Sequence, residues 1–113
     1  MQFEIHGKDI PITEQLRGHI QRRFSFALEP FAMRIRKVRV SVADLNGPRG
    51  GVDKRCLVAI VLIPSETIVI EERDLNIYVA IDRVGDRAGT CIGRRLKRGK
   101  GRGQDERISE LLS

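Results

Sequence analysis

The stretch CLVAIVLIPSETIVIEER, residues 56–73, decides the fold that we expect for this chain. Its first eight residues are all apolar, many of them β-branched, and they are too few for a typical helix, which predicts a central strand. Pro64 and Ser65 then turn the chain. Residues 67–73 return as a further strand, and so short a connection makes the two strands antiparallel neighbours.

Two more strands are expected before this pair. In residues 35–45, three valines alternate with polar side chains, which is the period-two pattern of a strand with one buried face. The glycine-rich residues 46–51 that follow form a loop by every local criterion. At the start of the chain, Phe3 and Ile5 alternate with polar residues up to Gly7, which predicts the first strand.

Two helical patterns complete the chain. Thr13 is expected to cap a helix whose apolar residues recur every three or four positions, with Pro30 near its end. Asp74 is expected to cap the last helix, whose apolar stripe continues from Ile77 to Ile92. The order β-α-β-β-β-α predicts an α+β sandwich of two layers: a four-stranded mixed sheet with two helices on one face, and a parallel crossover between the first two strands.

Length and composition predict one domain. The chain has 113 residues, of which 41% are hydrophobic, enough for a single core. We expect the domain to cover residues 1–98 and residues 99–113 to form a flexible charged tail. No signal region or membrane-length apolar stretch is present, so we expect a cytoplasmic protein. Cys56 and Cys91 lie within apolar patterns, which predicts buried thiols rather than ligands of a metal.

The net charge of +6 is unevenly distributed. Residues 66–82 carry one basic and five acidic side chains, whereas residues 83–102 carry eight basic and one acidic. At about 100° per residue, one face of the last helix presents a set that we call the basic ridge: Arg83, Arg87, Arg94, Lys97 and Arg98. Cations at one-turn spacing suit a phosphate backbone, and the alternative is a solvated helix face.

Each of the other notable features of the sequence has a functional and a structural interpretation. Arg49 and Lys54 lie on or beside the glycine-rich loop, which either contacts a partner or is a simple turn. Glycines recur every four residues in the last helix, and we favour close packing against the first helix over contact with RNA. His6 and His19 have no carboxylate or nucleophile at local spacing, so no enzyme, cofactor or small-molecule substrate is predicted.

Several motifs resemble the family of ribosome hibernation promoting factors and ribosome-associated inhibitors. They are the Met-Gln start of the first strand, the start of the first helix with Thr13, Glu14, Leu16 and Arg17, and the start of the last helix with Tyr78, Ala80, Ile81 and Asp82. The resemblance covers residues 1 to about 98, and the chain resembles a divergent short member. It implies a fold similar to double-stranded RNA binding domains and basic positions on both helices.

The resemblance implies that the protein binds ribosomal RNA of the small ribosomal subunit, blocks the messenger and transfer RNA sites during stress or stationary phase, and is not an enzyme. The RNA-binding residues predicted from the ridge, the loop and the resemblance together are Arg22, Arg23, Lys37, Arg39, Arg49, Lys54, Arg83, Arg87, Arg94, Arg95, Lys97 and Arg98.

Two alternatives remain open. One is a free-standing module that binds structured RNA, and the other is a protein-interaction module, since members of the family have been described as modulators of a sigma factor. The sheet face opposite the helices bears on the second alternative. Ala59, Val61 and Val69 are expected there, with Lys37 and Arg39 around them. This apolar patch favours self-association or another protein partner.

Overall fold

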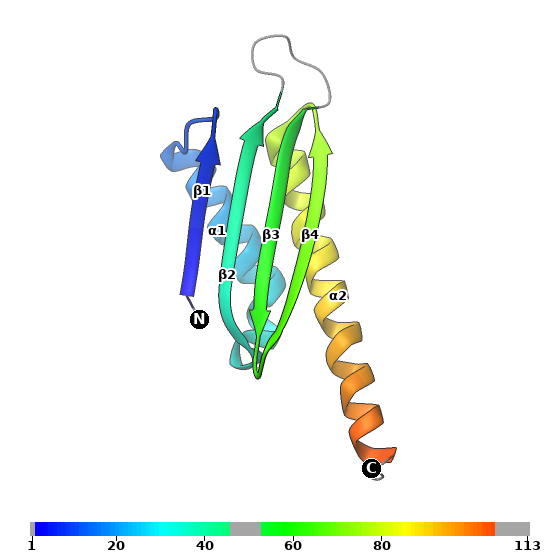
Figure 1. Ribbon diagram of the computed structural model, residues 1–113. Coiled ribbons are helices and arrows are strands. Elements are labelled where there is room, and N and C mark those ends of the chain that lie inside the picture. Colours follow the sequence, from blue (N-terminus) through cyan, green and yellow to red (C-terminus); the bar gives the residue numbers. More distant parts are fainter. Residues whose placement is uncertain (1, 46–52, 106–113) are drawn as a thin grey trace.

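The computed structural model describes residues 2–45 and 53–105, with side chains described up to Lys97. Its helices and strands are β1 (Gln2–Lys8), α1 (Glu14–Leu28), the 3-10 helix η1 (Glu29–Arg34), β2 (Ile35–Asp44), β3 (Lys54–Leu62), β4 (Glu66–Asp74) and α2 (Ile77–Asp105). This order confirms the predicted β-α-β-β-β-α arrangement (Figure 1).

The four strands form one mixed sheet in the order β1-β2-β3-β4. β1 pairs with β2 in parallel, as the long helical connection predicted, and the two later pairs are antiparallel. Both helices lie behind the sheet in the view of Figure 1, so the molecule has two layers. The predicted α+β sandwich is therefore confirmed.

The core lies between the sheet and the two helices. Alternate residues of β2 and β3 face inward, which is why the valines of β2 are buried. The buried residues of the helices are Leu16, Ile20, Phe24 and Leu28 on α1, and Ile77, Ala80, Ile81, Val84, Ala88 and Ile92 on α2. Because this stripe faces the sheet, the charged residues of α2 are left at its sides and on its outer surface.

The helix starts follow side-chain capping. The Thr13 hydroxyl accepts a hydrogen bond from the backbone N–H of Leu16 at 3.1 Å, which confirms the predicted cap of α1. The predicted cap of α2 at Asp74 is wrong, because the side chain of Asn76 accepts from the N–H of Tyr78 at 2.9 Å. Asp74, two residues earlier, instead accepts from the N–H of Asn76, also at 2.9 Å.

Gly85, Gly89 and Gly93 of α2 lie against α1 and η1. A methyl group added at Gly89 would approach the carbonyl oxygen of Ala27 to 3.3 Å, and one at Gly93 would approach the ring of Phe31 to 3.6 Å. A methyl group at Gly85 would come within 3.9 Å of Arg23. The expected close packing of the two helices is therefore confirmed, with the tightest approach at Gly89.

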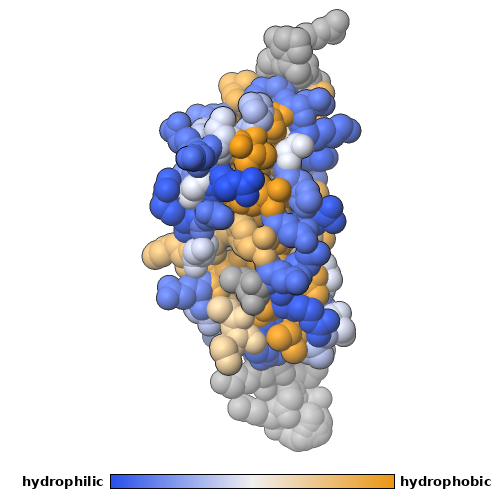
Figure 2. Space-filling view, turned by 90° about the vertical axis from the view of Figure 1, so that its left-hand side faces the viewer, coloured by the Kyte–Doolittle hydropathy of each residue, from blue (hydrophilic) through white to orange (hydrophobic). Residues whose placement is uncertain are grey.

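The β1 edge and the outer face of the sheet both leave apolar side chains partly exposed. On the side of the molecule that carries β1, an apolar band runs between hydrophilic flanks (Figure 2). Phe3 and Ile5 of β1 are only partly buried against the core. On the outer face of the sheet, Ala59 and Val61 are partly buried and Val69 is 59% exposed. That this outer face binds a partner stays a prediction.

The last helix extends past the expected end of the domain. Its bounds place the predicted boundary at residue 98 inside α2, which continues to Asp105. Residues 106–113 of the predicted tail lie outside the described residues. Within the described part of the chain, neither helix combines the length and the apolar character needed to cross a membrane.

Candidate nucleic-acid interface

Helix α2 lies along β4, and carboxylates of β4 meet the first basic residues of the helix. Arg83 Nη1 lies 3.2 Å from Asp74 Oδ1. Arg87 Nη1 lies 2.5 Å from Glu72 Oε2 and also donates a hydrogen bond to the backbone oxygen of Glu71 at 3.0 Å. These two residues of the basic ridge are about half exposed, but each already has an anionic partner.

A third cation of α2 is paired further along the same strand. The guanidinium of Arg95 forms an ion pair with Glu66, at the start of β4. Carboxylates of the acidic block therefore pair with Arg83 and Arg87 of the basic ridge and with the neighbouring Arg95. Because a phosphate bound at these arginines would lie near carboxylates, the paired cations are weaker anion ligands than unpaired ones.

The remaining described cations of the ridge are unpaired. Arg94 and Lys97 are exposed, and neither forms an ion pair with any described residue. The side chain of Arg98 lies outside the described part of the structure, as does the whole of Arg49. Among the described side chains of α2, the positive charge that is available to a partner is thus concentrated near residues 94–97.

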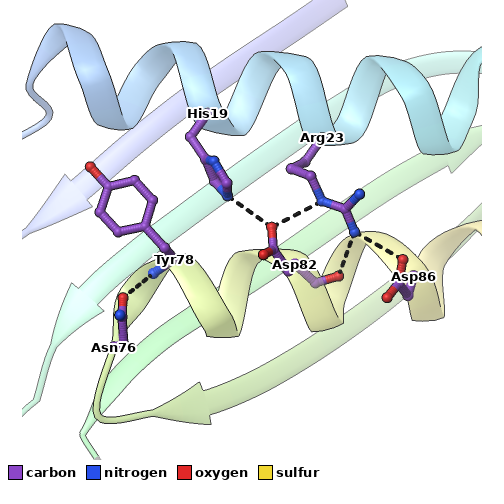
Figure 3. Close-up of polar contacts among 6 residues, drawn as sticks. All are labelled: His19, Arg23, Asn76, Tyr78, Asp82 and Asp86. Carbon is purple, nitrogen blue, oxygen red and sulfur yellow. Dashed lines mark hydrogen bonds and ion pairs between the residues drawn. The ribbon is translucent and has the colours of Figure 1, made fainter.

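Arg23 belongs to a polar network between the two helices (Figure 3). His19 Nε2 and Arg23 Nε contact the same oxygen, Asp82 Oδ1, at 2.8 and 2.9 Å. The contact of Arg23 Nε brings the charges together without the alignment of a hydrogen bond. Arg23 Nη2 donates to Asp86 Oδ1 at 2.9 Å and to the backbone oxygen of Asp82 at 3.2 Å. Arg23 therefore ties α1 to α2.

The sequence contained a signal for this network that our reading missed. His19 and Arg23 are four residues apart on α1, and Asp82 and Asp86 are four residues apart on α2, so each pair lies on one helix face. The ring of His19 also packs edge-on against Tyr78, with centroids 4.9 Å apart.

Arg22, next to Arg23, is exposed on α1 and has no ion pair with a described residue.

The predicted RNA-binding residues on the sheet lie close to carboxylates of neighbouring strands. Lys37 Nζ lies 3.1 Å from Glu4 Oε2, and Arg39 Nε lies 3.9 Å from Glu4 Oε1. A hydrogen bond from His6, followed by the one from Lys37, lowers the pKa of Glu4. Lys54 Nζ lies 3.1 Å from Asp44 Oδ2 across the β2–β3 hairpin.

Two cations that the sequence reading did not select lie at the end of the sheet. Arg34 ends η1 and is exposed without an ion pair to a described residue. Arg36 lies at an irregularity in the pairing of β2 with β3 and donates to the backbone oxygen of Pro64 at 3.3 Å. Residues 34–55 carry seven basic and two acidic side chains, so the sequence shows these cations, but the closeness of Arg34 to Leu96 and Lys97 of α2 depends on the fold.

Two hollows flank α2 on its β4 side. The first has a volume of about 530 Å³ and is lined by Val69, Ile70, Asp86, Arg87, Thr90, Cys91, Arg94 and Arg95. We call the second the lower groove: its volume is about 660 Å³, and it is lined by Arg34, Leu62, Ile63, Pro64, Glu66, Arg95, Leu96 and Lys97. Both hollows have arginine in their walls, so the available cations border concave surfaces.

The two cysteines differ in burial. Cys56 is fully buried, and burial raises the pKa of its thiol to about 12. Cys91 is only partly buried and lines the first hollow, so the prediction that both thiols are buried is wrong for Cys91. Among the described residues, no three potential metal ligands gather at one place.

The architecture and the cations can be compared with known proteins. The family model for "Sigma 54 modulation protein / S30EA ribosomal protein" matches residues 3–103. The chain belongs to this family. The match includes both helices and all four strands of the described fold, in agreement with the resemblance found from the motifs. No curated protein sequence matches the chain significantly.

Two solved structures share the fold. The N-terminal domain of Protein Y from Thermus thermophilus is similar with a TM-score of 0.68 and 23% identity, covering 83% of this chain and 98% of that one. A ribosomal subunit interface protein from Coxiella burnetii is similar with a TM-score of 0.73 and 15% identity, covering 86% and 99%. At these identities the likeness establishes the fold alone.

Proposed function

We propose that this protein binds the small ribosomal subunit through ribosomal RNA and blocks the messenger and transfer RNA sites, so that translation stops under stress. The observation that carries the proposal is that Arg94 and Lys97 on α2 are exposed and form no ion pair with a described residue, in a chain that belongs to a ribosomal protein family. Phosphate contacts from such residues supply most of the affinity of nucleic-acid binding.

The proposed ligand set is graded by ion pairing. Arg94 and Lys97 contact phosphates directly, since no described carboxylate competes for them. Arg83, Arg87 and Arg95 contribute less, because each must exchange or share a carboxylate of β4. Arg22 extends the surface onto α1. The other predicted ligands, Arg23, Lys37, Arg39, Arg49, Lys54 and Arg98, stay predictions.

The names of similar structures support the ribosomal setting. One of them is a ribosomal subunit interface protein, and the family description includes a ribosomal protein. A protein of this kind works by occupying a surface, so the proposal includes neither catalysis nor a cofactor. It also places the protein in the cytoplasm, where ribosomes are.

Two other functions use the same fold. A free-standing module for structured RNA would use the same cations, and a protein-interaction module would use the outer face of the sheet, where Val69 is 59% exposed. Self-association through that face predicts dimers in light scattering at high concentration, and their loss in Val61→Lys. A monomer at every concentration would remove self-association.

Sedimentation separates the ribosomal function from the alternatives. A lysate from stationary phase is run through a sucrose gradient, and the fractions are probed for this protein. We expect it to migrate with small subunits or whole ribosomes, and to return to the top of the gradient in high salt because phosphate contacts are screened. Migration at the top of the gradient at low salt would contradict the proposal. Purified large subunits serve as the matched control for binding.

A further inference from the structure

The lower groove combines an apolar floor with a cationic rim. Its floor is formed at the β3–β4 turn, where Leu62 is buried and Ile63 is 42% exposed. Pro64 is also exposed there, and Leu96 of α2 lines the same groove. An apolar surface of this kind binds a flat, uncharged group more favourably than it binds water.

The charges at the rim come from three different elements. Arg34 comes from η1, Arg95 and Lys97 come from α2, and Glu66 comes from β4. Among the described lining residues the one carboxylate is Glu66, and it already forms an ion pair with Arg95. Arg34 and Lys97 line the same apolar hollow from two different elements, and neither forms an ion pair with a described residue, so the groove attracts an anion with an apolar part.

We propose that the lower groove binds one unpaired nucleotide of the RNA, with its base against Ile63, Pro64 and Leu96 and its flanking phosphates at Arg34 and Lys97. A nucleotide fits both halves of this chemistry, since it joins a flat base to a phosphate. The inference rests on the proposed function, because it continues the proposed path of the RNA along α2 into the lower groove.

Continuity with the basic ridge favours RNA over an acidic protein segment. Lys97 belongs to both the ridge and the groove, and Arg94 lies almost one turn before it. A strand whose phosphates follow the unpaired cations of α2 therefore reaches the groove without crossing the paired arginines near the start of the helix. Arg34 then holds the strand from a second element, η1.

The test uses the whole chain and a short single-stranded oligouridylate. In NMR titration, we expect backbone signals of residues 62–66 and 95–97 to shift. Arg34→Gln is expected to weaken binding severalfold and to lower the salt slope of log K by about 0.7, the value of one single-strand phosphate. Ile63→Ser is expected to weaken binding with the salt slope unchanged. Arg17→Gln, an exposed cation on α1 outside the groove, is the control and keeps both values.

The outcomes separate the groove from the ribosomal function. If oligouridylate leaves residues 62–66 unshifted, or if Arg34→Gln behaves like Arg17→Gln, the groove does not bind a nucleotide, even when the parent protein binds small subunits. Shifts at the same residues with an acidic leucine-containing peptide but not with oligouridylate would make the groove a protein site. Groove binding of oligouridylate without binding to small subunits would support the groove and contradict the ribosomal function.

Discussion

The two halves of α2 differ in how far their described cations are available to a ligand. In the half near β4's end, Arg83 and Arg87 are held by Asp74 and Glu72. Toward the end of the helix, Arg94 and Lys97 have no described partner. The difference teaches that a dense basic run does not measure the charge available to a ligand. The carboxylates of the neighbouring strand decide which cations are free.

The largest effect is expected in the core beneath both halves. Ile81 is fully buried under the paired half of α2, so Ile81→Ala should reduce the free energy of unfolding by about 2 to 5 kcal/mol. Denaturant unfolding measures this, and Val69→Ala, at a side chain that is 59% exposed, is the control. If the two substitutions cost the same, α2 is not anchored as described.

A smaller loss is expected from the network that ties the paired half of α2 to α1. Asp82→Asn removes the charge shared by His19 and Arg23, and should cost about 1 to 2 kcal/mol of unfolding free energy. Asp86→Asn is the control, because Asp86 contacts Arg23 alone and its side chain is 77% exposed. A larger loss for Asp86→Asn would show that Asp82 is not the centre of the network.

The side of α2 that packs on α1 gives the smallest stability effect. Gly85→Ala should stabilise the protein by about 0.5 to 1 kcal/mol, because alanine favours helix and the new methyl group would meet nothing closer than 3.9 Å. Gly89→Ala should gain less or lose stability, because its methyl group would lie 3.3 Å from a backbone oxygen of α1. Thermal unfolding compares the two, and an equal gain would contradict the close approach at Gly89.

The fold was predictable because its signals are local. The alternating valines of β2, the apolar run of β3 and the stripes of both helices each identify an element from neighbouring residues alone. The cap of α2 is a feature that local signals do not decide. Asp74 and Asn76 are both capping residues two positions apart, and the sequence does not show which of them begins the helix.

The candidate site was predictable only in part. The sequence identifies the cations of the ridge, but their pairing depends on how α2 lies beside β4. Glu66 and Arg95 are far apart in the chain, and so are His19 and Asp82. Arg34 likewise joins the lower groove only because η1 ends beside α2. Long-range neighbours therefore decide which predicted ligands are available.

The salt dependence of binding to purified small subunits tests this account most directly. We expect Arg94→Gln and Lys97→Gln each to lower the salt slope of log K by about one, because each unpaired cation neutralises a phosphate. Arg83→Gln and Arg87→Gln should lower it by clearly less, because Asp74 and Glu72 already neutralise these arginines. If the paired arginines lower the slope as much as Arg94 and Lys97 do, ion pairing does not select the RNA ligands, and the account is contradicted.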